Sequence, residues 1–416
     1  MSVTHTNRRE LLQKGALLAA GCLAGGPAVL PAAEPERQVD SSQLKITGVK
    51  TYLLQHKLKR PFGVSVSVPL DQFRKTLLVK IETDVGLTGW GETAPVGGAR
   101  GTIDDQIGPR LIGQSPLEQR KLWRMMWGPN FGNALAVAAL DMAINDLRGQ
   151  ALNLPVAELF GGRLRDRVPA YASAMNYLED EQPEEQYPRE AEQLVKQGFK
   201  ALKMRLGRYP VLREAAVAAA VRNAVGPDIK LMADGNAAYT LSSALQMGEV
   251  LHDLNFEYFE EPLPQSPHYA GYEELRRKLT LPLAAGEGVD SRGSAKELID
   301  RQCMHIIQPD VSLCGGIGET LFISELAALS GIRCIPHCWG GAILIAATVQ
   351  TLSLMPDPHW GFPTDTPMLE LDQSENPWRT EIVKEPFQLK DGFVDVPTRP
   401  GLGIEVDEAI VKRYAI

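Results

Sequence analysis

From about Val168 onward the chain repeats one unit: a short apolar run, a polar residue where the run ends, and then a helix-like amphipathic stretch. Amphipathic stretches such as 211–225 and 316–331 separate the runs. Strands that alternate with helices at this spacing predict a parallel sheet, and eight such units predict a closed barrel of the α/β class. The eight runs are VPAYAS, FKALKMR, IKLMADGN, FEYFEE, LPLAAGE, MHIIQPD, IRCIPH and PMLEL.

The polar residues that end these runs keep the same rhythm. Glu260 follows Asp234 by 26 residues, and Glu287, Asp310 and His337 follow after another 27, 23 and 27 residues. One unit per step brings all of them to the same end of the barrel. In such barrels the C-terminal ends of the strands carry the chemistry, because the loops there vary while the barrel holds them in place. We therefore expect the active site at that end.

The first three of these residues, Asp234, Glu260 and Glu287, are carboxylic acids that end three successive runs. Carboxylates that converge on one barrel mouth raise one another's pKa values unless a cation compensates their charge. Mg²⁺ suits this role best, because it takes oxygen ligands and keeps positions open for substrate oxygens. Each acid alone is better explained as a helix N-cap or a surface residue, but three in register predict a Mg²⁺ site. The adjacent Glu261 is placed to hydrogen-bond a neighbouring group.

Candidate bases lie on both sides of these acids. Lys203 lies near the end of the second run and Arg205 is two residues further on, in strand alternation, so both are expected to point into the mouth. Asp310 and His337 lie one unit apart, where the Asp can fix the tautomer of the ring and raise its basicity. A metal between a lysine and a histidine suits removal of a proton α to a carboxylate. Three alternatives stay open: Lys203 as an ion-pair partner of the acids, His337 as a satisfied core histidine, and Glu370 as a structural salt-bridge partner.

The N-terminus has the features of an export signal. TNRRELLQKG (6–15) sets two arginines before the apolar ALLAAGCLAGG (16–26), and the segment ends near Ala33. This pattern predicts a twin-arginine signal over residues 1–33 and a periplasmic protein. The apolar core is too short and too rich in glycine for a membrane span. A lipid anchor at Cys22 and a basic tail on a cytoplasmic protein stay open as alternatives.

Residues 44–165 are predicted to form a separate α+β capping domain. Strands are expected over 44–67 and 75–91, with GLTGWGE (86–92) as a turn-rich closure. The strongly periodic ALAVAALDMAINDLRGQ (134–150) is then expected to be a helix.

The barrel is predicted over residues 166–380, and the tail 381–416 is expected to pack on the cap. The tail contains GFVDVPTRPGLGIEV (392–406), which is rich in glycine and proline with short β runs. The net charge of −8 comes from 51 acidic and 43 basic residues without a basic stripe, so nucleic acid is not expected as a partner.

Four cysteines follow the predicted signal, and CIPHC (334–338) brings two of them close to a histidine. No second CxxC or histidine pair accompanies this motif, so it does not predict a metal site. Buried free thiols are the expected state of Cys303, Cys314, Cys334 and Cys338, and disulfides, which export permits, stay open as the alternative.

These motifs, in this order, resemble the enolase superfamily and, within it, the mandelate racemase and muconate lactonizing enzyme group. The resemblance implies a modified (β/α)7β barrel, an α+β cap completed by the C-terminal tail, and cap loops around 56–74 and 94–102 that close over substrate. Within the group, cycloisomerases and dehydratases of acid sugars look most similar. The motifs are GLTGWGET, ALDMAINDLRGQALNLPVAELFGG, ALKMRLG, MADGN, FEEPLPQ, AAGE, IIQPDVSLCGGIGE, PHCWGGAILIAA and LELDQSENPWR.

The resemblance also implies a role for each candidate site residue. It implies Lys203 as one base, the His337 and Asp310 dyad as the other, and Glu370 as a hydrogen-bond donor to the substrate. It further implies a homo-oligomer. The Mg²⁺ ligands that it implies are Asp234, Glu260 and Glu287.

One departure from the family pattern changes the expected reaction. The group usually carries Lys-x-Lys on the second strand, whereas this chain has Lys203-x-Arg205. Arginine stays protonated and cannot be a base, although it can lower the pKa of Lys203 or bind a substrate anion. Racemisation needs a base on each face of the substrate, whereas elimination can use one. We therefore expect a Mg²⁺-dependent lyase or cycloisomerase that acts on a small carboxylate, a sugar acid or its lactone.

Two other functions stay open, a racemase or epimerase and an exported sugar-acid binding protein that has lost catalysis. A metal-dependent hydrolase is not favoured, because VPAYAS lacks the His-x-His expected on the first strand. Arg60, Phe62 and Arg74 of the cap are candidates for contacting the distal end of the substrate.

Overall fold

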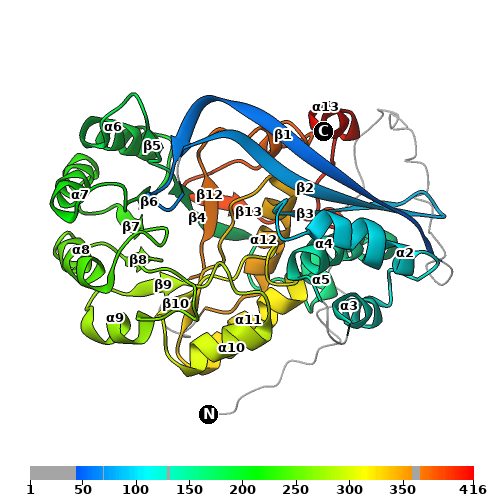
Figure 1. The fold of residues 1–416 in the computed structure, drawn as a ribbon. Coiled ribbons are helices and arrows are strands. Elements are labelled where there is room, and N and C mark those ends of the chain that lie inside the picture. Colours follow the sequence, from blue (N-terminus) through cyan, green and yellow to red (C-terminus); the bar gives the residue numbers. More distant parts are fainter. Residues whose placement is uncertain (1–43, 69, 129–131, 358–365) are drawn as a thin grey trace, which may run out of the picture. The chain divides into compact units, whose positions relative to one another are not determined.

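The computed structural model describes residues 44–68, 70–128, 132–357 and 366–416. The predicted export signal and Cys22 lie outside the described residues. Within them the chain forms an α+β cap and a curled sheet of parallel strands with helices around it, so the predicted α/β class with a capped (β/α)7β barrel is confirmed (Figure 1).

The cap is built on an antiparallel sheet with the strand order β3-β2-β1-β5. Its strands are β1 (Ile46–Gly63), β2 (Asp71–Thr83), β3 (Thr88–Thr93) and β5 (Tyr177–Leu178). The expected turn-rich closure at 86–92 is therefore wrong over most of its length, because residues from Thr88 onward form β3.

The glycines of β3 serve helix packing rather than turning. A Cβ on Gly89 would lie 2.1 Å from the carbonyl oxygen of Ala143, and one on Gly91 would lie 1.8 Å from that of Ala139. Both carbonyls belong to α4 (Ala134–Leu152), the predicted long helix, whose N-cap is Asn133. Only glycine lets the backbones of β3 and α4 approach this closely. The other cap helices are α1 (Ala99–Gly101), η2 (Thr102–Ile107), α2 (Gly108–Leu111), α3 (Gln119–Trp127) and α5 (Val156–Leu159).

All eight predicted runs contain strands of the parallel sheet, whose order is β11-β10-β9-β8-β7-β6-β4-β12. No ladder between β11 and β12 joins the two ends of this order among the described residues, so the sheet is curled without the full hydrogen-bonded closure that eight units suggested. The strands are β4 (Arg167–Ser173), β6 (Ala201–Arg205), β7 (Lys230–Asp234), β8 (Tyr258–Glu260), β9 (Leu283–Ala285), β10 (Ile306–Ile307), β11 (Arg333–Cys334) and β12 (Leu369–Asp372).

Each of the first seven barrel strands is followed by a helix, and β12 comes last, which is the (β/α)7β pattern. Figure 1 shows these helices on the outside of the curled sheet. They are α6 (Pro183–Lys196), α7 (Val211–Val225), α8 (Leu241–Asp253), α9 (Tyr272–Lys278), α10 (Arg292–Asp300), α11 (Ile317–Leu329) and α12 (Ala342–Leu354).

A layer of buried side chains fills the barrel beneath the site. Successive side chains of a strand point to opposite faces, so a residue two positions before a site residue points the same way, one layer lower. This relation holds for Ala201 and Lys203, and for Tyr258 and Glu260. The interior layer therefore sets the height of the charged layer above it. Its members are Tyr171, Ala201, Met232, Tyr258, Ala284, Ile306, Ile335 and Met368.

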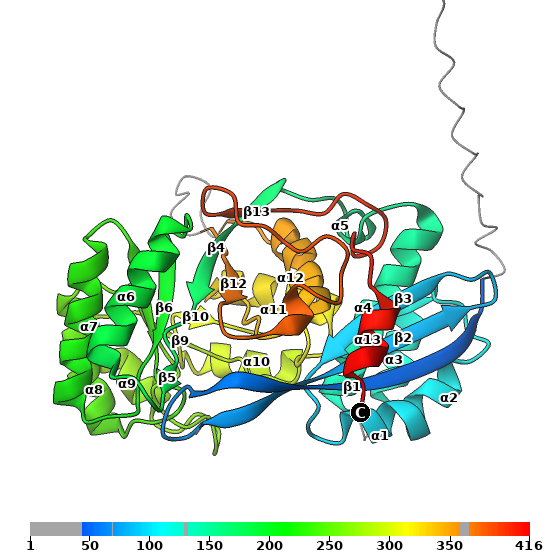
Figure 2. The ribbon, with the colours of Figure 1, turned by 90° about the horizontal axis from the view of Figure 1, so that it is seen from above.

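The C-terminal tail contacts both the barrel and the cap. After the short η4 (Pro377–Arg379), β13 (Phe393–Asp395) pairs antiparallel with β4 of the barrel. Helix α13 (Glu408–Tyr414) then lies along β1 of the cap, and Ile416 N donates to Leu53 O at 2.9 Å (Figure 2).

Two further sequence expectations concern the described part of the chain. Its four cysteines are buried and free, as predicted. No helix within the described ranges is long and apolar enough to cross a membrane.

Candidate active site

Lys203 lies under the barrel mouth rather than in it. Its side chain is fully buried at the end of β6, and Nζ lies 2.6 Å from Glu260 Oε1, 2.8 Å from Glu370 Oε1 and 3.6 Å from Asp234 Oδ2. Burial lowers the pKa of Lys203, but the three carboxylates outweigh it and hold the pKa well above its ordinary value. This is the ion-pair arrangement that the sequence left open, and the role of Lys203 as a base stays a prediction.

Arg205 lies one strand repeat further on and reaches the mouth. Its Nη1 pairs with Asp234 and lies 3.3 Å from Asn236 Oδ1, and its Nη2 donates to Ser173 Oγ at 3.1 Å. The guanidinium carbon lies 4.6 Å from the ring centre of Trp339. Burial lowers the pKa of Arg205, whereas Asp234 and other carboxylates raise it, with a net rise. Arg205 is therefore a fixed positive charge at the edge of the mouth.

The two carboxylates of β7 and β8 are also buried and satisfied. Glu260 Oε2 accepts from Gln308 Nε2 at 2.8 Å, and Asp234 Oδ1 accepts from Asn236 N at 2.8 Å. Burial raises the pKa of Glu260 to about 8, and the repulsion from Asp234, Glu370 and Glu287 contributes, although Lys203 opposes it.

Glu261 turns away from Glu260 and supports the next strand end. Its Oε1 accepts from the backbone N of Gly286 at 3.2 Å, the residue before Glu287. The backbone of Glu261 has φ of 36°, a left-handed conformation that sends the two adjacent side chains in different directions.

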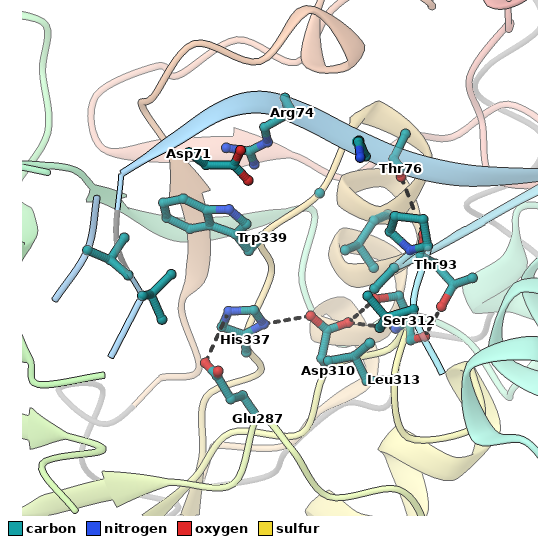
Figure 3. A pocket seen from close by; sticks show the side chains of 18 of the residues that line it. Asp71, Arg74, Thr76, Thr93, Glu287, Asp310, Ser312, Leu313, His337 and Trp339 are labelled. Carbon is teal, nitrogen blue, oxygen red and sulfur yellow. Dashed lines mark hydrogen bonds and ion pairs between the residues drawn. The ribbon is translucent and has the colours of Figure 1, made fainter. Parts of the chain in front are cut away.

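His337, Asp310 and Glu287 form a chain of contacts on the other side of the mouth (Figure 3). Nδ1 of His337 lies 2.6 Å from Asp310 Oδ2, and Nε2 lies 3.3 Å from Glu287 Oε2. The His337 side chain is 12% exposed and that of Glu287 is 27% exposed, in contrast with Lys203 at 0%. Burial lowers the pKa of His337, but Glu287, Glu370 and Asp310 outweigh it and raise the pKa to about 10.

Glu370 of β12 connects the two sides. Its Oε1 pairs with Lys203, and its Oε2 accepts from Cys338 N at 3.0 Å and lies 4.0 Å from His337 Nε2. Burial raises its pKa, but Lys203, His337 and Arg205 outweigh burial and lower it below the ordinary value. This is the salt-bridge arrangement left open by the sequence, and the role of Glu370 as a donor to substrate stays a prediction.

A cavity of about 510 Å³ opens above the dyad, between the barrel mouth and the cap. Its floor includes His337, Asp310, Glu287 and Arg205, whereas Lys203 does not line it. Residues from both predicted cap loops line the opposite wall, and most are apolar. The larger apolar ones are Leu58, Phe62, Val64, Val68, Phe73, Pro95 and Val96.

The three cap residues proposed to contact substrate have different positions. Phe62 lines the cavity. Arg74 also lines it, but its Nη2 donates to Asp372 Oδ2 at 2.7 Å and its Nη1 to Ser374 Oγ at 2.8 Å. Arg60 lies outside this cavity and pairs with Asp180 and Glu181.

The donor set fits a hard divalent ion in its chemistry. Asp234, Glu260 and Glu287 offer oxygen ligands from three neighbouring strand ends, and their mutual repulsion contributes to raised pKa values at Glu260 and Glu287. Within residues 44–68, 70–128, 132–357 and 366–416, no three potential ligand groups lie close enough together to hold an ion. Each of the three carboxylates contacts a cationic side chain: Arg205, Lys203 or His337.

Several residues at the mouth were not singled out from the sequence. Gln308 and Asn236 follow a strand in QPD and DGN, so position at a strand end was the available signal. Trp339 follows His337 by two residues and lies near Arg74 in Figure 3, with 4.9 Å between the guanidinium carbon and the ring centre. No sequence pattern indicated that this ring lies between the cap and the barrel.

Known proteins are similar to this chain over most of its length. The profile of the mandelate racemase / muconate lactonizing enzyme N-terminal domain matches residues 47–161, and that of the enolase C-terminal domain-like family matches residues 186–410. D-galactarolactone cycloisomerase of Agrobacterium fabrum is 34% identical over 378 residues, which cover 89% of this chain and 99% of that protein. Arabinonate dehydratase of Saccharolobus solfataricus is 30% identical and covers 80% of this chain and 89% of its own.

Solved structures agree with these sequence relatives. The 3,6-anhydro-D-galactonate cycloisomerase of Zobellia galactanivorans superposes with a TM-score of 0.79 at 32% identity, over 89% of this chain and 99% of its own. A racemase of Streptomyces coelicolor A3(2) with bound magnesium superposes with a TM-score of 0.78 at 25% identity, over 89% of this chain and 100% of its own. Because both domain profiles match in order and a relative aligns along nearly its full length, this chain belongs to the mandelate racemase and muconate lactonizing enzyme group of the enolase superfamily, and it is an enzyme of that group.

Proposed function

We propose that this enzyme removes the proton α to the carboxylate of a sugar acid or its lactone, with Mg²⁺, and then eliminates the group on the β carbon. The product is a dehydrated acid when water leaves, or a rearranged acid when a ring oxygen leaves. The named activities of the sugar-acid dehydratase and the two cycloisomerases among the similar proteins support this substrate class.

One observation carries the proposal: of the two predicted bases, Lys203 and His337, only His337 lines the cavity. It lines the cavity with Asp310 on Nδ1, whereas Lys203 is fully buried under three carboxylates. Asp310 fixes the ring so that Nε2 faces the cavity, and an imidazole held in this way suits general acid–base work. A single base supports elimination better than racemisation, which needs a second base on the opposite face.

Asp234, Glu260 and Glu287 would hold the Mg²⁺ ion, which supplies positive charge for the enediolate oxygens when it is bound. The chain's own groups then account for the proton and the leaving group. A cation held by Glu287 would offset the carboxylate charge that raises the pKa of His337. The neutral ring then takes the α proton at Nε2 while the C–H electron pair moves toward the carboxylate. When that pair returns to form the C=C bond, the bond from the β carbon to oxygen breaks, and protonated His337 can return the proton to the departing oxygen. Arg205 adds a permanent positive charge at the edge of the mouth.

We also propose export by the twin-arginine route, with the lipid anchor at Cys22 and a cytoplasmic location as the alternatives, and assembly into a homo-oligomer. The arginine pair and the short apolar core before Ala33 support export. Fractionation of cells that express the full chain, compared with a chain whose Arg8 and Arg9 are replaced by lysine, tests the route. Retention of the wild type in the cytoplasm would contradict it, and light scattering measures the oligomer.

The activity is tested by incubating signal-free protein and Mg²⁺ with aldonic and aldaric acids and their lactones. We expect formation of a 2-keto-3-deoxy acid, or of a ring-opened isomer, from at least one compound, abolished by EDTA and by His337→Asn. Exchange of the α proton without elimination would instead indicate an epimerase. Binding of a sugar acid without turnover or exchange would indicate the binding protein.

A further inference from the structure

The loop that carries His337 makes hydrogen bonds to residues of both the barrel and the cap. Glu370 accepts from Cys338 N at 3.0 Å, and Asn376 Nδ2 donates to Gly340 O at 2.9 Å. Both of these partners belong to the barrel strand β12 and the loop that follows it. The remaining hydrogen bonds come from the cap.

Glu92, near the end of cap strand β3, accepts these hydrogen bonds. Its side chain is buried, and its two oxygens accept from Gly341 N at 2.7 Å and Leu344 N at 3.0 Å, in the first turn of α12. A carboxylate at the N-terminus of a 13-residue helix is stabilised by the free backbone N–H groups there. A Cβ on Gly341 would lie 2.8 Å from Trp378 Cβ and 3.0 Å and 3.1 Å from the two carboxylate oxygens of Glu92, so the backbone after the His337 loop approaches this carboxylate closely.

The next cap residue, Thr93, supports the other half of the dyad. Ser312 donates to Asp310 Oδ1 at 2.6 Å from both its backbone N and its Oγ. Thr93 Oγ1 in turn donates to Ser312 O at 2.8 Å (Figure 3). The carboxylate that orients His337 is therefore itself oriented by a serine that the cap holds.

We propose that Glu92 and Thr93 are positioning residues for the His337 and Asp310 dyad, so that the seating of the cap on the barrel sets the geometry of the base. Adjacent residues of a strand point to opposite faces, which lets one short piece of β3 reach both the His337 loop and the Asp310 loop. The inference rests on the proposed function, because it assigns these contacts a role in the work of the dyad.

The deciding variant is Thr93→Val, which removes the hydroxyl and keeps the shape of the side chain. Thr83→Val is its matched control, because Thr83 is also buried in the cap sheet and its Oγ1 donates to a backbone oxygen, that of Leu87, at 2.9 Å. Thr83 lies outside the cavity lining. Thr93→Ser restores the hydroxyl.

We expect Thr93→Val to lower kcat about 10-fold with KM changed by less than about twofold, because small misplacement of a base slows the chemical step. Thr83→Val should keep the wild-type kcat, Thr93→Ser should recover it, and both valine variants should lower Tm by similar amounts. An unchanged kcat in Thr93→Val, an equal loss in Thr83→Val, or a change in KM alone would overturn the inference.

Hydrogen–deuterium exchange tests the same contacts without turnover. Amides in 311–316 should exchange faster in Thr93→Val than in Thr83→Val, and amides in 338–344 should exchange faster in Glu92→Gln than in wild type. Unchanged exchange in both segments would overturn the positioning role. A wild type that turns over no acid would instead refute the proposed function, so the two failures are distinguishable.

Discussion

The two sides of the barrel mouth use the same kinds of residues in opposite ways. On the side of β6 to β8, Lys203 is fully buried and paired with Glu260, Glu370 and Asp234. On the side of β9 to β11, His337 contacts Asp310 and Glu287 and lines the cavity. Carboxylates raise the pKa of both cations, but only the imidazole of His337 lines the cavity and can exchange a proton with a substrate there. Access to the cavity, rather than residue type, therefore distinguishes His337, the proposed base, from Lys203 and its buried carboxylate partners.

The largest effect that sharpens this comparison is expected from His337→Asn. Loss of the proposed base should lower kcat by about 10³-fold or more, since general base catalysis contributes 10²–10⁴-fold. The exposed His252 on α8 provides the control, and His252→Asn should keep the wild-type kcat. Steady-state kinetics on the compound found in the acid panel measures both, and equal activity of the two variants would remove His337 from the reaction.

Lys203→Met tests the side of β6 to β8 through its effect on the free energy of unfolding. Removing one partner of a buried ion pair leaves uncompensated charge on Glu260 and Glu370, so the free energy of unfolding should fall by about 3–5 kcal/mol. Lys50→Met is the control, because the Lys50 side chain is 55% exposed in its pair with Glu82 and should lose at most about 1 kcal/mol. Denaturant unfolding measures both losses. Similar small losses of unfolding free energy in the two variants would mean that Lys203 does not stabilise the buried carboxylates of the site.

Asp310→Asn tests the side of β9 to β11, because Asp310 orients the imidazole ring of His337. The amide cannot hold the imidazole in the same tautomer and charge state, so we expect kcat of the folded variant to fall about 10²-fold. Asp300→Asn, which alters an exposed pair with Lys296 on α10, should leave kcat unchanged. A loss of stability that matches the loss of activity would assign Asp310 a structural role only.

The smallest expected effect concerns Asp146, a buried carboxylate of α4. Backbone N–H groups donate to it, whereas the carboxylates at the barrel mouth pair with cationic side chains. It accepts from Leu402 N at 2.9 Å and Trp90 N at 3.0 Å, and burial raises its pKa to about 6. Because the folded pKa lies above the unfolded value of about 3.9, the stabilisation is present below about pH 4 and is lost as pH rises through about 6.

The free energy of unfolding of wild type minus that of Asp146→Asn should therefore fall by about 1–3 kcal/mol between pH 4.5 and 7.5. Denaturant titrations at several pH values give this difference. A difference that rises with pH would mean that the carboxylate is stabilised in its charged form, like the acids beside Lys203.

Local pattern was enough to find most of the fold. The eight apolar runs and the helices 211–225 and 134–150 are visible because period and spacing are local properties of the chain. In GLTGWGE, Gly86 does lie in a turn with φ of 86°, but Gly89 and Gly91 were misinterpreted, because they allow close contact with α4, about 50 residues further along the chain. Composition alone does not distinguish a glycine that turns from one that admits a helix.

The candidate site divides in the same way. The identity of its charged residues could be predicted, because each ends a strand and strand ends meet at one face. The burial of Lys203 below the cavity could not, because it depends on how the neighbouring acids pack around its ammonium group. The contact of Glu92 with Gly341 spans 249 residues and two domains, and no local pattern encodes it.

The most direct test of the account is α-proton exchange in His337→Asn. The variant, with Mg²⁺ in D₂O, is incubated with both C2 epimers of the acid that the wild type converts, and the α position is followed by NMR. The account predicts no deuterium at the α carbon of either epimer above the enzyme-free control, because Lys203 is buried and paired away from the cavity. Deuterium incorporation into one epimer by His337→Asn would show a second working base on the opposite face and would contradict the one-base account.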